Sequence, residues 1–147
     1  MADLESKLRP LAESLLEPGE ELLGCCVATQ SSTFSGRLVA IAVTRARVVV
    51  QGVGRRWEAK GDPLSLTPEL IADASAEGGA GDWMTLSTAL VDHASVALEL
   101  RTHDAQKLKL VMMRAEGLGF SALGGGEIQR EGVGALGEWF ARNAPRA

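Results

Sequence analysis

The two histidines are the first side chains to test for chemistry, because the imidazole ring is the commonest metal ligand and general base. His93 and His103 each stand beside an aspartate in this chain of 147 residues. A metal centre would need both rings to converge with a further ligand, such as a cysteine. The two histidines flank one predicted strand, so at about 3.3 Å per residue they would lie roughly 30 Å apart. We therefore expect surface or turn histidines and no metal site.

Neither the cysteines nor the glycines form a recognisable catalytic or cofactor motif. Cys25 and Cys26 are adjacent, and neighbours on a strand point to opposite faces, so we expect one to act as a small core hydrophobe. Gly117, Gly119 and Ala122 fit the GxGxxA pattern of a dinucleotide-binding turn. About 25 residues follow Ala122, too few for the helix, second strand and acid that such a site requires. We expect no cofactor, no catalytic residue and hence no enzyme.

Charge is distributed unevenly along the chain, which has 15 lysines and arginines against 19 acids. Residues 37–60 contain one acid, Glu58, and six basic residues, whereas residues 61–100 contain seven acids and no lysine or arginine. Opposite patches favour head-to-tail association, a basic groove would suit an anionic ligand, and solvated strand faces are the third explanation. The candidate binding residues are Arg37, Arg45, Arg47, Arg55, Arg56 and the neighbouring Trp57.

Composition limits the class of protein. The length suits one domain, and 46% apolar with 23% charged residues is typical of a soluble globular protein. No run approaches the roughly 18–20 apolar residues of a membrane span, and the start, MADLESKLRP, lacks the apolar stretch of a signal peptide. With no cysteine spacing for a disulfide framework, we expect a cytoplasmic protein. The net charge of -4 and the absence of tyrosine argue against nucleic acid as a partner.

The pattern of apolar residues predicts a helix, then strands, then a closing helix. Leucines 4, 8, 11 and 15 form one stripe of an amphipathic helix that ends at Pro18-Gly19, with Pro10 either bending it or moving its start near Leu8. Residues 21–30 follow as a strand. Residues 37–44 and 47–53 predict a hairpin whose first strand is apolar on both faces, so both faces should be covered.

The second half of the chain predicts a further hairpin. Residues 54–69 suggest a loop with one short edge strand, and residues 69–78 another strand. The segment 83–94 fits helix and strand equally, whereas residues 96–112 alternate clearly as two strands around a turn. The Gly-rich passage 116–127 is interpreted as a link to a closing helix over 132–144.

Three stretches of the sequence resemble bacterial pleckstrin-homology-like (PH-like) domains: LLEPGEELLG, AIAVTRARVVVQG and GVGALGEWFARN. The resemblance spans nearly the whole chain and implies one PH-like domain over residues 1–147. It also implies a mainly β (α+β) fold, in which six to seven antiparallel strands form a bent, partly open barrel. An N-terminal helix precedes the strands, and a C-terminal helix closes one end by burying Leu136, Trp139 and Phe140.

The resemblance implies a binding or scaffold module without catalytic activity. PH-like domains that bind phosphoinositides carry lysines and arginines in the first hairpin loop, but residues 30–36 of this chain contain none. The acidic region 61–94 is longer than a minimal version of the fold and could form a partner surface. We expect recognition of a protein partner, another copy of the chain included. The alternatives are an anionic lipid headgroup or small anionic ligand bound through residues 37–60, and an enzyme built on His93 or His103 without a recognised motif.

Overall fold

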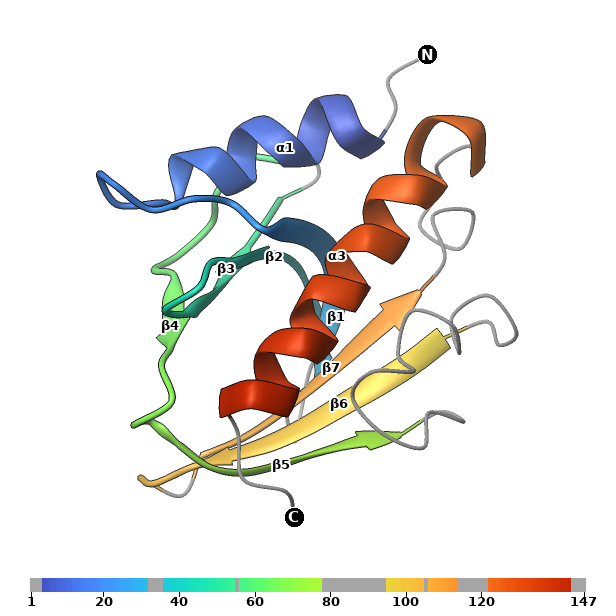
Figure 1. Ribbon diagram of the computed structural model, residues 1–147. Helices are drawn as coiled ribbons and strands as arrows, with labels where there is room; N and C mark the ends of the chain where they lie inside the picture. Colours follow the sequence, from blue (N-terminus) through green and yellow to red (C-terminus); the bar gives the residue numbers. More distant parts are fainter. Residues whose placement is uncertain are drawn as a thin grey trace.

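The computed structural model describes residues 4–31, 36–54, 56–77, 95–104, 106–113 and 122–143. Two helices and seven strands follow one another along these segments (Figure 1). Their bounds are α1 Leu4–Ser14, β1 Gly24–Ser31, β2 Gly36–Val43, β3 Val48–Gly52, β4 Leu64–Leu66, β5 Ile71–Glu77, β6 Ser95–Thr102, β7 Lys107–Met113 and α3 Ala122–Asn143. The segment 83–94, for which helix and strand were both open, lies outside the described residues.

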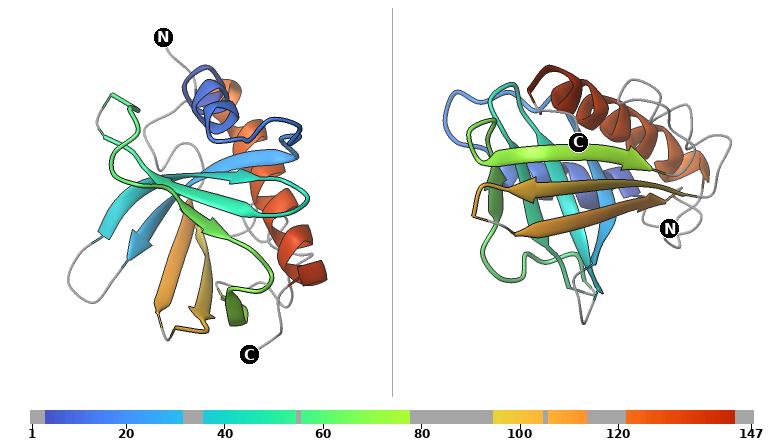
Figure 2. Two further views of the ribbon diagram at one scale, coloured as in Figure 1. Left: turned by 90° about the vertical axis from the view of Figure 1, so that its left-hand side faces the viewer. Right: turned by 90° about the horizontal axis from the view of Figure 1, so that it is seen from below.

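All seven strands belong to one antiparallel sheet in the order β4-β3-β2-β1-β7-β6-β5. β1 pairs with β2 along its whole length but with β7 only from Ala28 to Ser31, so the sheet can bend where β1 and β7 meet. Figure 2 shows β5–β7 turned strongly against β1–β3, with α3 alongside. The sheet is therefore barrel-like and open between its edge strands β4 and β5. This confirms the PH-like fold class expected from the sequence.

The interior of the bent sheet is filled by apolar side chains. Val39, Ile41 and Val43 of β2 point into it, and all three are fully buried. α3 contributes Trp139 and Phe140, whose rings meet edge to face with centroids 5.1 Å apart. Because burying one such ring contributes about 2–3 kcal/mol, α3 is a principal part of the core. The predicted role of the closing helix is confirmed.

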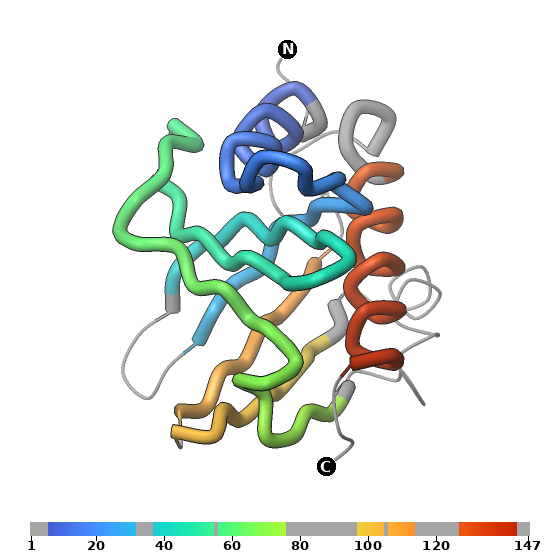
Figure 3. Tube along the Cα trace, turned by 60° about the vertical axis from the view of Figure 1, so that its left-hand side comes forward, coloured from blue at the N-terminus to red at the C-terminus, as the bar shows by residue number. Residues whose placement is uncertain are grey.

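A second apolar cluster covers the outer face of β1–β3. The other side of β2, with Ala40 and Ala42, packs with Leu8 and Leu11 of α1 and with Leu15 just after it. α1 lies beside the β2–β3 hairpin (Figure 3). Both faces of β2 are therefore covered, as predicted.

The bounds of α1 differ from those expected. The helix starts at Leu4 and contains Pro10, so a start near Leu8 is wrong. It ends at Ser14, before Pro18, and Gly19 adopts a positive φ of 88° in the turn that follows. Burial of the leucine stripe offsets the one backbone hydrogen bond that proline removes.

α3 begins ten residues before the predicted start, so the interpretation of residues 122–127 as a linker is wrong. Residues 124–126 are glycines, and glycine disfavours a helix by about 1 kcal/mol per residue, so the sequence pattern did not indicate that the helix starts here. Tertiary packing explains why residue 132 of this helix is a glycine, because a Cβ at Gly132 would lie 1.9 Å from the carbonyl oxygen of Cys25. Glycine at this position therefore lets α3 approach the backbone of β1 closely.

Gln129 of α3 joins β1 to β7 just beyond the end of their pairing. Its fully buried amide accepts a hydrogen bond from Val27 N (2.9 Å) and donates to Val27 O (2.8 Å) and Met113 O (2.9 Å). A buried backbone group without a partner is costly, so this side chain replaces the missing strand contacts. No sequence pattern indicated this role.

The remaining predicted strands are confirmed. β4 is the short strand at the sheet edge, β5 falls within the predicted 69–78, and β6 and β7 form the second hairpin. In the part of the chain that the structure describes, neither helix combines the length and apolar character needed to cross a membrane.

Candidate functional site

The structure divides the predicted arginine-rich site between two ends of the β2–β3 hairpin. Arg45 is exposed in the turn that joins the two strands, whereas Arg37 is exposed at the other end of β2. The strand between them spans about 20 Å. Arg56 and Trp57 follow β3 at the Arg37 end, and Arg55 lies outside the described residues. The described members of this segment therefore do not form one groove.

Arg47 is occupied by contacts inside the protein. Its guanidinium binds both carboxylate oxygens of Glu20, with Nη2 2.7 Å from Oε1 and Nε 2.9 Å from Oε2. It also donates to Ser65 Oγ at 2.7 Å and to the carbonyl oxygen of Leu15 at 3.1 Å. Only 13% of the Arg47 side chain is exposed. Arg47 thus connects the end of α1, the α1–β1 loop and β4, and we assign it a structural role.

The contact with Arg47 also determines the acidity of Glu20. Hydrogen bonding to Arg47 is the main reason why the pKa of Glu20 is lowered to about 2. The backbone N–H of Glu17 adds a hydrogen bond to Glu20 Oε1 at 2.8 Å. Glu20 is therefore ionised over the whole physiological range, and the ion pair is permanent there.

Trp57 packs against the outer apolar cluster. Its backbone has a positive φ of 62°, unusual for a residue with a side chain, in a turn where Trp57 N donates to Gly54 O (3.1 Å). The same turn is closed by Gly54 N donating to Glu58 O (3.0 Å). Trp57 is half-buried and packs against this cluster, which is a contact typical of a packing residue.

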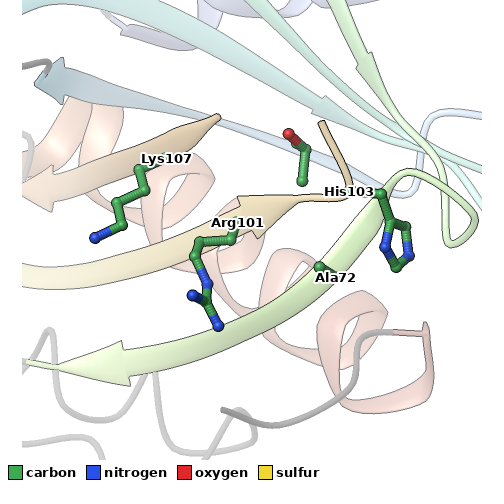
Figure 4. Close-up of a pocket in the computed structure, with 5 residues that line it drawn as sticks. Ala72, Arg101, His103 and Lys107 are labelled. Carbon is green, nitrogen blue, oxygen red and sulfur yellow. The ribbon is translucent and has the colours of Figure 1, made fainter. Parts of the chain in front are cut away.

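A surface pocket of about 330 Å³ lies on a different part of the sheet, where β5 meets the β6–β7 turn. Figure 4 shows the side chains that line it, with Ala72 between Arg101 and His103. The lining residues are Ala72, Arg101, Thr102, His103 and Lys107. Arg101, His103 and Lys107 are exposed. Arg101 and His103 flank the small hydrophobic floor, and Lys107 lies on the far side of Arg101 (Figure 4). Neighbouring nitrogen-bearing side chains of this kind suit an anionic group.

A break in strand pairing positions the floor of this pocket. Ile71 pairs with Thr102 and Asp73 pairs with Arg101, so Ala72 is an extra residue in β5. Such β-bulges redirect side chains and are enriched next to functional sites. The backbone N–H of His103 donates to Leu70 O at 3.0 Å and holds the β6–β7 turn against the bulge.

Asp73 binds one edge of the Arg101 guanidinium. Arg101 Nε lies 3.0 Å from Asp73 Oδ2, and Nη2 donates to the same oxygen. The hydrogen bond lowers the pKa of Asp73 and raises the pKa of Arg101. Both groups remain charged at neutral pH, so the guanidinium has a fixed orientation beside the pocket.

Sequence reasoning identified the β6–β7 hairpin but missed this pocket. In the register of that hairpin, Glu99 lies opposite Lys109 and Arg101 lies opposite Lys107. The pocket depends on the bulge at Ala72, about 30 residues earlier in the chain. No local pattern marks a bulge of this kind, so the signal was not available before the strands were paired.

The described part of the chain places the other chemistry-bearing residues away from one another. His103 is an exposed turn residue, as predicted, and His93 lies outside the described residues. Cys25 faces the α1 side and Cys26 the interior, which confirms their alternation, and burial raises the pKa of the Cys26 thiol. Within the described segments, no group of three histidine, cysteine or acidic side chains is placed to bind a metal.

Comparison with known proteins yields structural similarities only. No protein-family model and no curated protein sequence matches this chain. A C-terminal domain of an unknown protein from Leishmania infantum is 15% identical, with a TM-score of 0.44 over 81% of this chain and 89% of that one. The hSac2 domain of human phosphoinositide phosphatase Sac2 is 11% identical, with a TM-score of 0.45 over 76% and 65% of the two chains.

A third similar structure is human RhoA in complex with the DH/PH fragment of PDZRHOGEF. It is 12% identical, with a TM-score of 0.47, and the alignment covers 85% of this chain but only 30% of the other. Similarities of this size do not define function. The fold class rests on the strand order and on the burial of α3 in the bent sheet.

Proposed function

We propose that the chain is a PH-like binding module, without catalytic activity, that docks a partner protein through charged surface contacts. The first partner to test is another copy of the chain. The observation that carries this proposal is the filled interior of the bent sheet, where Trp139 and Phe140 have no exposed surface. An interior packed in this way holds no ligand, so recognition takes place on the outside.

The outer surface supports contacts between charges over contacts between apolar patches. Among the described residues, Leu23 is the one large hydrophobic side chain that is exposed, at 43%. Permanent dimer interfaces are more apolar than this. Exposed basic groups occur at both ends of the β2–β3 hairpin, and exposed acids follow in the next segment of the chain. Charge-driven docking of this kind is transient and sensitive to salt.

Sedimentation velocity at about 0.05 M and about 0.5 M salt tests the proposal. We expect association at low salt that falls at high salt. The variant Arg45→Glu reverses an exposed charge in the β2–β3 turn and should weaken association. Lys7→Glu makes the same change on the exposed side of α1 and serves as the matched control. A monomer at both salt concentrations would refute self-association, and an equal loss in both variants would remove the hairpin turn from the interface.

A further inference from the structure

We propose that the pocket between β5 and the β6–β7 turn binds a phosphate-like oxyanion, such as the phosphomonoester group of a soluble metabolite or of a lipid headgroup. The ligand contacts would come from Arg101 and Lys107, and Ala72 forms the floor of the pocket. It lies outside the arginine-rich segment and is independent of the proposed docking of a protein. Three observations support it.

The first observation is a pair of like charges placed directly opposite each other. Arg101 of β6 pairs with Lys107 of β7, whereas the next outward pair, Glu99 with Lys109, is complementary. Like charges at opposed positions of a sheet destabilise it. An anion between the two cations would convert this repulsion into two charge-assisted hydrogen bonds. No hydrogen bond or salt bridge is formed by the Lys107 ammonium among the described residues, although its charge helps to lower the pKa of Asp73. Its N–H groups are therefore available for such a contact.

The second observation is the way Asp73 holds Arg101. Asp73 accepts hydrogen bonds from Nε and Nη2 of the guanidinium. The N–H groups of Nη1 have no partner in the described part of the chain. The carboxylate therefore fixes the orientation of the guanidinium, while the edge formed by Nη1 and Nη2 still has free N–H groups. Such a planar edge matches two oxygens of a phosphate group. Asp73 is a positioning residue in this site.

The third observation is the space that the bulge creates. The extra residue in β5 is an alanine, whose methyl group leaves about 330 Å³ open beside Arg101 and His103. The hydroxyl of Thr102 is not an available donor, because it is engaged with Asp104 and lies near Gln106 O. The ligand contacts are thus assigned to the side chains of Arg101 and Lys107, with His103 at the border.

The charge balance around the pocket sets the expected affinity. Asp73 and Asp104 partly offset the two permanent cations. We therefore expect weak binding of inorganic phosphate, with a Kd of about 0.1–1 mM at low salt.

Titration of the full chain with inorganic phosphate, followed by amide NMR shifts, tests the site directly. We expect saturable shifts confined to the residues around Ala72, Arg101 and Lys107. Lys107→Gln removes one cation, and Ala72→Leu fills the floor without changing any charge; each should weaken binding at least about tenfold. Lys109→Gln is the matched control, because it removes a cation from the neighbouring outward position of β7 and should leave the affinity within about twofold.

Two further arms distinguish the source of the phosphate group. Flotation with phosphatidylcholine vesicles that contain phosphatidic acid tests a lipid headgroup, and vesicles of equal charge made with phosphatidylglycerol control for charge alone. Glycerol phosphate tests a soluble ligand by NMR. Binding to phosphatidic acid vesicles above the phosphatidylglycerol control, if it is lost in Lys107→Gln, supports a lipid headgroup as the ligand. Binding of glycerol phosphate that is lost in the same variant supports a soluble phosphomonoester.

Three results would overturn the proposal. The first is the absence of saturable shifts with phosphate in a folded protein. The second is an equal effect of Lys107→Gln and Lys109→Gln, which would indicate general surface electrostatics. The third is tighter binding of a polyglutamate peptide than of phosphate at the same amides, which would assign the surface to acidic proteins instead.

Discussion

Replacing Arg47 with alanine is expected to loosen three elements at once. Its guanidinium contacts Glu20 in the α1–β1 loop, Ser65 in β4 and the carbonyl oxygen of Leu15 at the end of α1. Of these elements, β4 is an edge strand of three residues and α1 has only eleven. Short elements of this kind depend on tertiary contacts for their stability.

The magnitude follows from how far the ion pair is removed from water. The side chains of Arg47 and Glu20 are exposed by 13% and 16%. A fully exposed pair contributes about 0–1 kcal/mol, and breaking a fully buried one costs about 3–5 kcal/mol. The bidentate geometry and partial burial place this pair between the two limits, so we expect Arg47→Ala to lower the free energy of unfolding by about 2 kcal/mol. In a chain of 147 residues, that change lowers Tm by about 4–8 °C.

The same ion pair makes stability depend on pH in a defined direction. The pKa of Glu20 is lowered to about 2 in the folded protein, with the Arg47 hydrogen bond as the main cause. The unfolded chain therefore binds the proton more tightly. The stabilisation is complete above the ordinary glutamate pKa and is lost as pH falls from about 5 toward 2. Because the pair keeps some contact with water, we expect this contribution to be about 1–2 kcal/mol.

Urea denaturation of the wild type, Glu20→Gln and the matched control Glu21→Gln measures this contribution. The difference between wild type and Glu20→Gln should be largest near neutral pH and shrink toward zero as pH falls. Glu21 is exposed in the same loop, so its variant should remain close to the wild type throughout. For Arg47→Ala, the neighbouring exposed Arg45→Ala is the control. A difference for Glu20→Gln that does not change with pH, or equal losses at Arg45 and Arg47, would refute the reasoning.

Further predictions concern the contacts of α3. Gln129→Leu should lower the free energy of unfolding by about 3 kcal/mol, because it leaves the buried backbone N–H and C=O groups of Val27 without these partners. Chemical denaturation measures this change, and a loss under about 0.5 kcal/mol would contradict the prediction. Gly132→Ala should lower the free energy of unfolding by about 2–3 kcal/mol, since the added methyl group would overlap the Cys25 carbonyl. An unchanged Tm would show that α3 can shift away from β1 at no cost in stability, which would contradict the prediction. Trp139→Ala should cost about 3–5 kcal/mol and lower unfolding cooperativity in calorimetry, because it removes the largest fully buried side chain in the described part of the protein.

Much of the fold could be predicted from local patterns. Alternating apolar residues located the β2–β3 and β6–β7 hairpins, and the leucine stripe located α1. Patterns of this kind report which face of an element is buried, and that is a local property. The start of α3 could not be predicted in the same way, because its glycines are unfavourable in an isolated helix and are stabilised by packing against β1.

The candidate site was harder to predict than the fold. Arginines close in sequence suggested one basic groove, but a strand separates its ends, so Arg37 and Arg45 point to different parts of the surface. Arg47 looked the same as its neighbours in the sequence, and only its contact with Glu20 shows that it is structural. Whether a charged side chain is available to a ligand depends on partners that come from distant segments.

The sequence by itself determined which apolar faces of the strands and of α1 are buried, the order of the strands along the chain and the closing role of the helix that carries Trp139. The tertiary structure decided where β5 bulges at Ala72, which cations face each other and which carboxylates bind them. The physical reason is that hydrophobic periodicity is encoded residue by residue along each element. The pocket and its charge pairs arise only when β5 is paired with β6, across residues that are far apart in the chain.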